Sequence, residues 1–467
     1  MQENKVTISD LFNSRLDPHF YRKEFINLIN SLDNSIAYKL GDIVEFSNET
    51  WGQNSSYIDD FPYIEISEID IKTGKIQKIN WCRVKEAPSR AKMILDSGDI
   101  IISTTRPQRG AISIIPSKYK GYIASTGFSI IRKIKKNDLL KEYLYTFLRT
   151  NLSLQQMLQR SSGGNYPAIN QEELKKILVP VPSVGMQEQI VKIMSDANIK
   201  RQEKYDKAKD LLESINDILF KELNIVIPKI DNKKEFKTTI SNILGSRLDP
   251  KYHQPKYETL AKYIKTNIKD LYSLEDICDE IISGQRPKGG VSQVKEGIPS
   301  LGGEHVLRDG TIETTNLKFI PEDFHKKQIK SKINPLDIIL VKDGATTGKV
   351  GIIPEEYPFK EANINEHVFI LRCKKHINPY YILAFLLSEI GQTQIEREIS
   401  GATIMGITKD SLKNILIPLP SHNTQILIAN EYNMRLEQAQ NLKKEADKEF
   451  EKSKARVERI ILGEETL

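Results

Sequence analysis

Two long stretches of this 467-residue chain are copies of one another, and this duplication limits the fold more than any other feature. The signature Ser-Arg-Leu-Asp-Pro at Ser14–Pro18 recurs at Ser246–Pro250, and the segment 162–190 aligns without a gap to 400–428. The offset grows from 232 residues at the signature (246 − 14) to 238 at the later segment (400 − 162). A repeat of this length predicts two similar modules, each followed by the same kind of connector.

Each module is expected to be α+β. Ile100–Ile102 and Ile338–Val341 are short, branched apolar runs bounded by turn residues, which is typical of buried strands. Helical patterns follow at Leu139–Leu158 and Pro379–Ile399.

After a Pro-x-Pro pair at the end of each module, glycine and proline all but disappear and apolar residues recur every three or four positions. These residues are Ile190, Ile193, Ala197, Tyr205, Ala208, Leu212, Ile215 and Leu219 in the first connector, and Ile428, Tyr432, Leu436, Ala439, Leu442, Ala446, Phe450, Val457 and Ile460 in the second. The pattern predicts two long amphipathic helices with coiled-coil-like seams, the first interrupted by Arg201. Each helix could pack on its own module, but the narrow seams and matching lengths favour packing on each other.

These patterns divide the chain into five parts. Residues 1–184 hold an N-terminal segment and the first module, 185–224 the first helix, 225–245 a linker, 246–421 the second module and 422–463 the second helix. The linker segment Asn224–Thr239 contains Pro228 and the polar run Asp231–Lys234, so an exposed connector is expected there.

The composition bears on the possible partners of the chain and on its cellular compartment. The net charge of +6 allows a nucleic-acid partner without requiring one. The basic clusters at Arg83–Lys92 and Lys118–Lys141 fit a solvated lysine-rich surface as well as they fit a nucleic-acid interface. Three widely spaced cysteines, Cys82, Cys278 and Cys373, suggest neither a zinc site nor a disulfide framework. The first residues, Met1–Lys5, are polar, so no signal peptide is expected, and the apolar runs are shorter than the about 20 residues of a membrane span. We therefore expect a soluble, cytoplasmic protein.

The repeated motif resembles a known family. Two divergent modules, each closed by Leu-Lys-x-Ile-Leu-[Val/Ile]-Pro-x-Pro-Ser-x-x-x-Gln and a long helix, are similar to the specificity subunits of type I restriction-modification enzymes. Ser283–Lys288, followed by Gly297–Pro299, resembles the opening of their target recognition domains, and Asp337–Lys349 resembles the central segment. The first module departs from this pattern, because Glu45–Trp51 stands where the family has a Gly-x-x-Pro opening.

The resemblance implies an α+β fold with two tandem target recognition domains, separated by two long antiparallel coiled-coil helices in a pseudo-two-fold arrangement. Each domain is expected to read one half of a bipartite site in double-stranded DNA. The implied partners are two methyltransferase subunits and the restriction/translocase subunits. S-adenosylmethionine and ATP are expected on those partners, so this chain should hold no cofactor, metal or catalytic residue.

Two modules on one rigid spacer predict two half-sites on one face of the duplex, separated according to the helical repeat of about 10–10.5 base pairs. Because the modules differ in sequence, the whole site should be asymmetric. Arginine can pair bidentately with guanine, and glutamine with adenine, while lysine and arginine also bind phosphates. The candidates near strand ends are Thr105, Arg106, Gln108 and Arg109 in the first module, and Gln285, Arg286, Lys288, Lys342, Thr346, Thr347 and Lys349 in the second. The polar loop Ser161–Asn165 is suited to approach a phosphate.

Catalytic motifs are weak by comparison. Gly344–Val350 has one residue too few between its glycines for a phosphate-binding loop and lacks the Ser or Thr after Lys349, so a turn between strands is expected. Asn378–Tyr381 lacks the second proline of a methyltransferase motif, and an asparagine-capped helix start explains it better. The seven histidines are scattered. Two other functions stay open: an enzyme with a cryptic nuclease or methyltransferase site, and a coiled-coil scaffold without DNA affinity.

Overall fold

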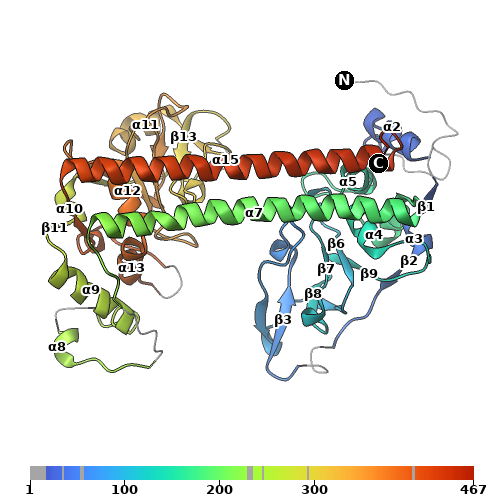
Figure 1. Cartoon of the computed structure of the whole chain (residues 1–467), viewed down its shortest axis with the longest axis horizontal. Coiled ribbons are helices and arrows are strands. Elements are labelled where there is room, and N and C mark those ends of the chain that lie inside the picture. The colour runs from blue at the N-terminus through green and yellow to red at the C-terminus, as the bar shows by residue number, and fades with distance from the viewer. Residues whose placement is uncertain are drawn as a thin grey trace. The chain divides into compact units, whose positions relative to one another are not determined.

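The computed structural model describes residues 17–33, 36–52, 57–228, 235–244, 247–291, 294–401 and 405–466 (Figure 1). Ser14, Arg15 and Leu16 of the first signature, Ser246 of the second and the polar linker run 231–234 lie outside the described residues. The chain divides into two compact units: unit 1 comprises Met1–Glu203 and Lys444–Leu467, and unit 2 comprises Lys204–Lys443.

Unit 1 is built on two four-stranded sheets and one strand pair. The first sheet has the order β2 (Val44–Ser47), β9 (Phe128–Ile134), β6 (Ile100–Ser103), β7 (Ile112–Ile114). The second has the order β4 (Asn80–Arg83), β3 (Asp60–Ile64), β8 (Ile123–Ser125), β5 (Ala91–Ile94). Strand β1 (Ala37–Lys39) pairs with β10 (Leu178–Pro180), which brings the start and the end of the module together.

Unit 2 repeats this plan. Its first sheet has the order β12 (Cys278–Ser283), β18 (Val368–Cys373), β15 (Ile338–Val341), β16 (Val350–Ile352). Its second has the order β14 (Lys318–Ile320), β13 (Ile298–Leu301), β17 (Asn363–Ile364). Strand β11 (Leu271–Ser273) pairs with β19 (Leu416–Pro418), as β1 pairs with β10.

Both units also contain short helices. Unit 1 has α2 (Lys23–Asp33), α3 (Leu40–Ile43), α4 (Lys141–Leu148), α5 (Asn151–Arg160) and α6 (Gln171–Leu174). Unit 2 has α8 (Ile240–Ile243), α9 (Pro255–Asn267), α10 (Leu274–Ile277), α11 (Glu322–Lys327), α12 (Pro379–Leu387), α13 (Glu389–Glu398) and α14 (Lys409–Leu412). Single 3-10 turns lie at Ile66–Glu68, Val84–Glu86, Pro107–Arg109, Ser117–Tyr119, Gly303–His305 and Ile329–Ser331. Each helical segment expected from the sequence is thus two helices; in unit 2 the break falls at Ser388, whose hydroxyl accepts from the Gly391 N–H and caps α13.

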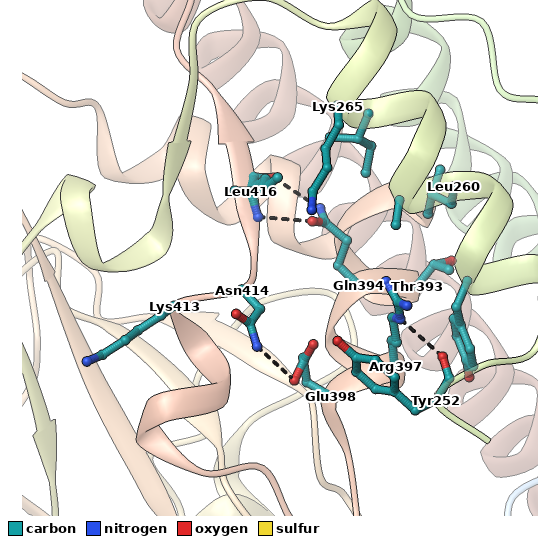
Figure 2. Close-up of a pocket in the computed structure, with 13 residues that line it drawn as sticks. Tyr252, Leu260, Lys265, Thr393, Gln394, Arg397, Glu398, Lys413, Asn414 and Leu416 are labelled. Atoms are coloured by element: carbon teal, nitrogen blue, oxygen red, sulfur yellow. Dashed lines mark hydrogen bonds between the residues drawn. The ribbon is translucent and has the colours of Figure 1, made fainter. Parts of the chain in front are cut away.

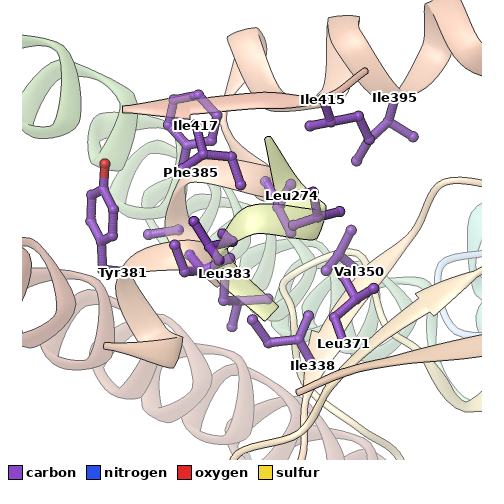
Figure 3. Packing of buried hydrophobic residues seen from close by; sticks show 14 of the residues in the cluster. Leu274, Ile338, Val350, Leu371, Tyr381, Leu383, Phe385, Ile395, Ile415 and Ile417 are labelled. Atoms are coloured by element: carbon purple, nitrogen blue, oxygen red, sulfur yellow. The ribbon is translucent and has the colours of Figure 1, made fainter. Parts of the chain in front are cut away.

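The cores confirm the two expected buried strands. Every residue of Ile100–Ser103 and of Ile338–Val341 is buried. In unit 2, β15, α12 and β19 contribute Ile338, Tyr381 and Ile417 to one apolar cluster (Figure 3). The Tyr381 hydroxyl donates to the Pro418 carbonyl, as Tyr143 does to Pro180 in unit 1.

Part of the expected exposed connector is buried. Ile225 is 6% exposed and belongs to the core of unit 2, and the next residue, Val226, donates its N–H to the Tyr263 hydroxyl of α9. The prediction of an exposed connector is therefore wrong at Ile225. Burying this large apolar side chain against α9 removes it from water, a gain that the polar residues further along the linker do not offer.

The two connectors form the long helices α7 (Val184–Glu222) and α15 (His422–Ile461), which lie side by side in each unit (Figure 1). In unit 1, Ile190 of α7 packs with Val457 and Ile460 of α15. In unit 2, Leu219 of α7 shares a core with Ile428 of α15. Later residues of one helix therefore meet earlier residues of the other, so the pair is antiparallel, and the expected packing of the helices on each other is confirmed.

Arg201, which interrupts the apolar seam of α7, is accommodated by an ion pair. Its side chain is 7% exposed, its Nε donates to Oδ1 of Asp447 at 2.9 Å, and its guanidinium lies 5.1 Å from the ring centre of Phe450. A buried charge is tolerated when it is paired and hydrogen-bonded in this way. No helix in the described part of the chain is both long and apolar enough to cross a membrane.

Candidate nucleic-acid interface

In unit 2, three loops leave the same edge of one sheet. Strand β12 ends at Ser283, β15 ends at Val341, and β18, which lies between them and runs antiparallel to both, begins at Val368. Adjacent antiparallel strands place the end of one beside the start of the next. The loops 284–291, 342–349 and 365–367 are therefore neighbours, and the Lys342 N–H donates to the His367 carbonyl at 2.7 Å.

Unit 1 has the same edge. Its strands β2 and β6 end at Ser47 and Ser103, and β9 begins between them at Phe128. The Thr104 N–H donates to the Gly127 carbonyl at 2.8 Å, the counterpart of the bond from Lys342 to His367. The backbone of this edge is therefore shared by the two units.

A fourth loop joins the edge in both units. In unit 1, Thr105 is bridged to Ala168, and the Arg106 N–H donates to the Pro167 carbonyl at 2.7 Å. In unit 2, Asp343 is bridged to Gly406 in the same way; residues 402–404 lie outside the described residues. The loops that contain the repeated Ser-Gly (161–168 and 400–406) thus pack beside the loops that carry most of the sequence-predicted candidates.

Backbone conformation sets the two edges apart at one position. Arg106 adopts a left-handed conformation with φ 48°, and the corresponding residue of unit 2 is Gly344 with φ 95°. An L residue is disfavoured there by about 1–2 kcal/mol, and glycine is not. Unit 1 therefore holds an arginine in a strained conformation where unit 2 has a glycine.

The structure brings the unit 1 candidates together with the 161–168 loop. The Arg106 guanidinium lies 4.2 Å from the ring centre of Tyr166, and its Nη2 donates to the Asn165 carbonyl at 3.1 Å. Tyr166 is itself 70% exposed and was not singled out by the sequence. Arg109 is exposed, and Oε1 of Gln108 has no hydrogen-bond partner among the described residues.

The unit 2 candidates divide into exposed side chains and side chains that contact the rest of the unit. Gln285, Arg286 and Lys288 are exposed on the loop after β12. The Thr347 hydroxyl donates to the Gly344 carbonyl at 2.7 Å, and Thr346 reaches the Gly303 carbonyl at 3.4 Å. The Lys342 ammonium lies 3.8 Å from Oδ2 of Asp343, and that of Lys349 donates to the Val306 carbonyl at 3.2 Å, so both lysines already have a partner within the protein.

Sequence reasoning missed three residues at this edge: Asp343, Glu366 and His367. Nδ1 of His367 lies 2.5 Å from Oδ1 of Asp343, and its Nε2 lies 3.4 Å from Oε1 of Glu366. Glu366 in turn lies 3.1 Å from Nε of Arg286. The repeat did not align Glu366 and His367 with the first module, because its offset is 238 at Lys342 (342 − 104) but 240 at His367 (367 − 127). Asp343 does align, at an offset of 238, with the candidate Thr105.

The basic cluster 118–141 of unit 1 is largely ion-paired. Nε of Arg132 lies 2.7 Å from Oδ1 of Asp99, a carboxylate with no exposed surface, and burial raises the pKa of that carboxyl. Lys120 lies 3.1 Å from Asp96, and Lys136 lies 2.8 Å from Asp138. These cations are compensated locally, so the cluster offers less charge to a partner than its sequence suggests.

Arg247 of the second signature contacts the end of α13, just before the 400–406 loop. Arg247 donates from Nη1 to the Glu398 carbonyl at 2.8 Å, at the end of α13, where that loop begins. A pocket of about 200 Å³ opens beside this contact between α9 and α13 (Figure 2). Arg397 donates to the Tyr252 carbonyl at its wall, and Glu398 accepts from Asn414; burial raises the pKa of the Glu398 carboxyl. The contacts indicate that this region anchors the signature to α13.

The two segments that resemble phosphate-binding and methyltransferase motifs have structural roles. Gly344–Lys349 forms the turn between β15 and β16, as expected. The Asn378 side chain accepts from the N–H groups of Tyr380 and Tyr381 and so caps α12, which confirms the predicted helix start. Among the described residues, no group of three or more His, Cys, Asp or Glu side chains is placed to hold a metal ion.

Comparison with known proteins identifies relatives for most of the chain. The family model described as "Type I restriction modification DNA specificity domain" matches residues 34–204 and 269–432. The HindI specificity subunit of Haemophilus influenzae is 27% identical over 187 residues, an alignment that spans 39% of each chain. The putative MjaX specificity subunit of Methanocaldococcus jannaschii is 24% identical over 438 residues, 91% of this chain and 92% of that one. The crystal structure of the HsdS subunit from Thermoanaerobacter tengcongensis aligns over 92% of this chain and 97% of that one, with 21% identity and a TM-score of 0.36.

Proposed function

This chain belongs to the type I restriction-modification DNA specificity family, and we propose that it binds a bipartite, asymmetric DNA site, with one half read by each unit. The observation that carries the proposal is the pair of loop edges. Both units present the same backbone bonds between the loops, at Thr104 and Gly127 and at Lys342 and His367, but different side chains. One scaffold with two sets of side chains is what two different half-sites require, because base edges are distinguished by side-chain donors and acceptors.

The partners follow from the relatives, which are named as specificity subunits of type I restriction enzymes. We infer that this chain directs methyltransferase subunits, two of them, and restriction/translocase subunits to the site. S-adenosylmethionine and ATP would bind to those partners. The paired helices α7 and α15, of 39 and 40 residues, would set the separation of the half-sites, since each contributes to both units.

The chain itself is proposed to be non-catalytic. A cryptic nuclease or methyltransferase is the main alternative, and incubation of the purified chain with DNA and Mg²⁺, or with DNA and S-adenosylmethionine, separates the two. Turnover by the chain alone would contradict the proposal. The third possibility is a scaffold without DNA affinity. A DNA affinity of the purified chain that falls steeply as the salt concentration rises would exclude it, because that dependence reports the release of counterions from the phosphates.

The decisive experiment is co-expression with the cognate methyltransferase subunit, followed by mapping of methylated adenines across the host genome. Methylation at a single two-part motif that depends on this chain is the expected result. If the methyltransferase is active with another specificity subunit and no motif depends on this chain, the proposal is wrong.

A further inference from the structure

We propose that Arg286 reads a guanine in the half-site bound by unit 2, and that Glu366, braced by His367 and Asp343, is the positioning residue for its guanidinium. The inference rests on the proposed function and assigns one specificity-determining residue within it.

The orientation of Arg286 suits a base contact. Its side chain is 65% exposed, and its Nε lies 3.1 Å from Oε1 of Glu366, whose side chain is 26% exposed. The two terminal Nη groups have no partner among the described residues. They form the planar pair of donors that matches O6 and N7 of guanine in the major groove.

The carboxylate that holds Arg286 is itself fixed. Glu366 lies 3.4 Å from Nε2 of His367, whose Nδ1 lies 2.5 Å from Oδ1 of Asp343. The chain of contacts joins the loops after β12, before β18 and after β15. An arginine held by a three-loop network loses less conformational entropy on binding than a free one.

A glycine lets two of these loops approach. A Cβ atom on Gly284 would lie 2.0 Å from the Asn365 carbonyl oxygen, a distance that no side chain tolerates. The loop that carries Arg286 therefore lies directly against the loop that carries Glu366. This close approach is a backbone feature, so it persists when either side chain is changed.

Unit 1 shows that the network is not needed to build the edge. Its backbone makes the equivalent bridge with Thr105 in the place of Asp343, and the equivalent hydrogen bond with Gly127 in the place of His367. Thr126 precedes Gly127 where Glu366 precedes His367. Side chains that the scaffold does not require are free to specialise for recognition. Carboxylates near a duplex also repel phosphates, so this arrangement favours orientation of a base-reading arginine over simple phosphate binding.

The test is selection of bound duplexes from a randomised library by the full-length chain in complex with its methyltransferase subunit. We expect Arg286→Ala to lose the preference for guanine at one position of one half-site, by roughly 5- to 150-fold, with every other position unchanged. Glu366→Ala should lose part of the same preference without weakening binding to unrelated DNA. Glu366→Gln, which keeps an oxygen acceptor beside Nε of Arg286, should retain more of it. Lys288→Ala is the matched control from the same loop and should weaken all sequences alike.

Three results would overturn the inference. An unchanged base preference in Arg286→Ala would do so, and so would an equal loss of affinity for every sequence, which would mark Arg286 as a phosphate contact. Equal behaviour of Glu366→Ala and Glu366→Gln at full discrimination would remove the positioning role. A wild-type complex with no sequence preference would instead contradict the proposed function, so the two failures are distinguishable.

Discussion

Arg372 donates two parallel hydrogen bonds to Asp337, from Nε to Oδ1 at 2.9 Å and from Nη2 to Oδ2 at 2.8 Å. The carboxylate precedes the central strand β15 and is 2% exposed. Unit 1 has the corresponding ion pair, in which Nε of Arg132 lies 2.7 Å from Oδ1 of Asp99. The pair therefore joins the turn before the central strand to the neighbouring strand in both units, and it belongs to the scaffold and not to a DNA-binding surface.

Removing this carboxylate should destabilise unit 2. Asp337→Asn removes the buried counter-charge of Arg372 and leaves it paired only with Glu280, whose side chain is 51% exposed. We therefore expect a loss of about 3 kcal/mol of unfolding free energy, the low end of the cost of breaking a buried pair. Glu275→Gln is the control, because it breaks an ion pair with Lys413 in which both side chains are about half exposed, worth about 0–1 kcal/mol. Urea unfolding of both variants checks the prediction, and equal losses would contradict it.

The left-handed conformation of Arg106 predicts an unusual order of stabilities. Arg106→Gly and Arg106→Ala both lose the contact with Tyr166, but only alanine keeps the Cβ atom that disfavours φ 48°. The glycine variant should therefore be more stable than the alanine variant by about 1 kcal/mol, measured by urea unfolding. An alanine variant at least as stable as the glycine variant would show that the conformation is not strained. Both variants should bind DNA more weakly than the wild type.

Glu458 predicts a pH dependence of stability. It lies on α15 and accepts from the Asn151 N–H at 2.6 Å, at the start of α5, and burial raises the pKa of its carboxyl above the ordinary 4.5. An acid whose pKa is raised by folding contributes stability at low pH and loses it as pH rises through the raised value. Glu458→Gln stays neutral, so its stability relative to the wild type should improve from pH 4.5 to pH 7. Urea unfolding at both pH values tests this, with Glu437→Gln, an exposed position on the same helix, as the control. A pH-independent difference for Glu458→Gln would refute the prediction.

Salt dependence separates phosphate contacts from engaged lysines. Arg109 and Lys288 are exposed on the loop edges, and each alanine substitution should lower the slope of log affinity against log salt by about 1. Lys349→Ala should leave the slope unchanged, because its ammonium donates to the Val306 carbonyl. The measurement is DNA binding at several salt concentrations. An unchanged slope in Arg109→Ala or Lys288→Ala would remove that residue from the phosphate contacts.

Much of the fold could be predicted from local patterns. The apolar runs at Ile100 and Ile338 predict buried strands, and the seam from Ile190 to Leu219 predicts a helix, because a short apolar run and a helical period are both properties of neighbouring residues. The same reasoning failed at Ile225, whose burial depends on a contact with distant α9, and it treated Arg201 as an interruption because its partner Asp447 lies on another helix.

The sequence by itself determined the duplication, the α+β modules and the two long helices. The duplication is visible as a sequence repeat, and the strands and helices follow from apolar patterns within single segments. Only the tertiary structure decided which side chains share an edge. Arg286 and Glu366 meet because β12 pairs with β18, although the two strands are separated by most of the module. Pairing between strands depends on packing among residues that are far apart in the sequence, so no local sequence pattern predicts which strands pair.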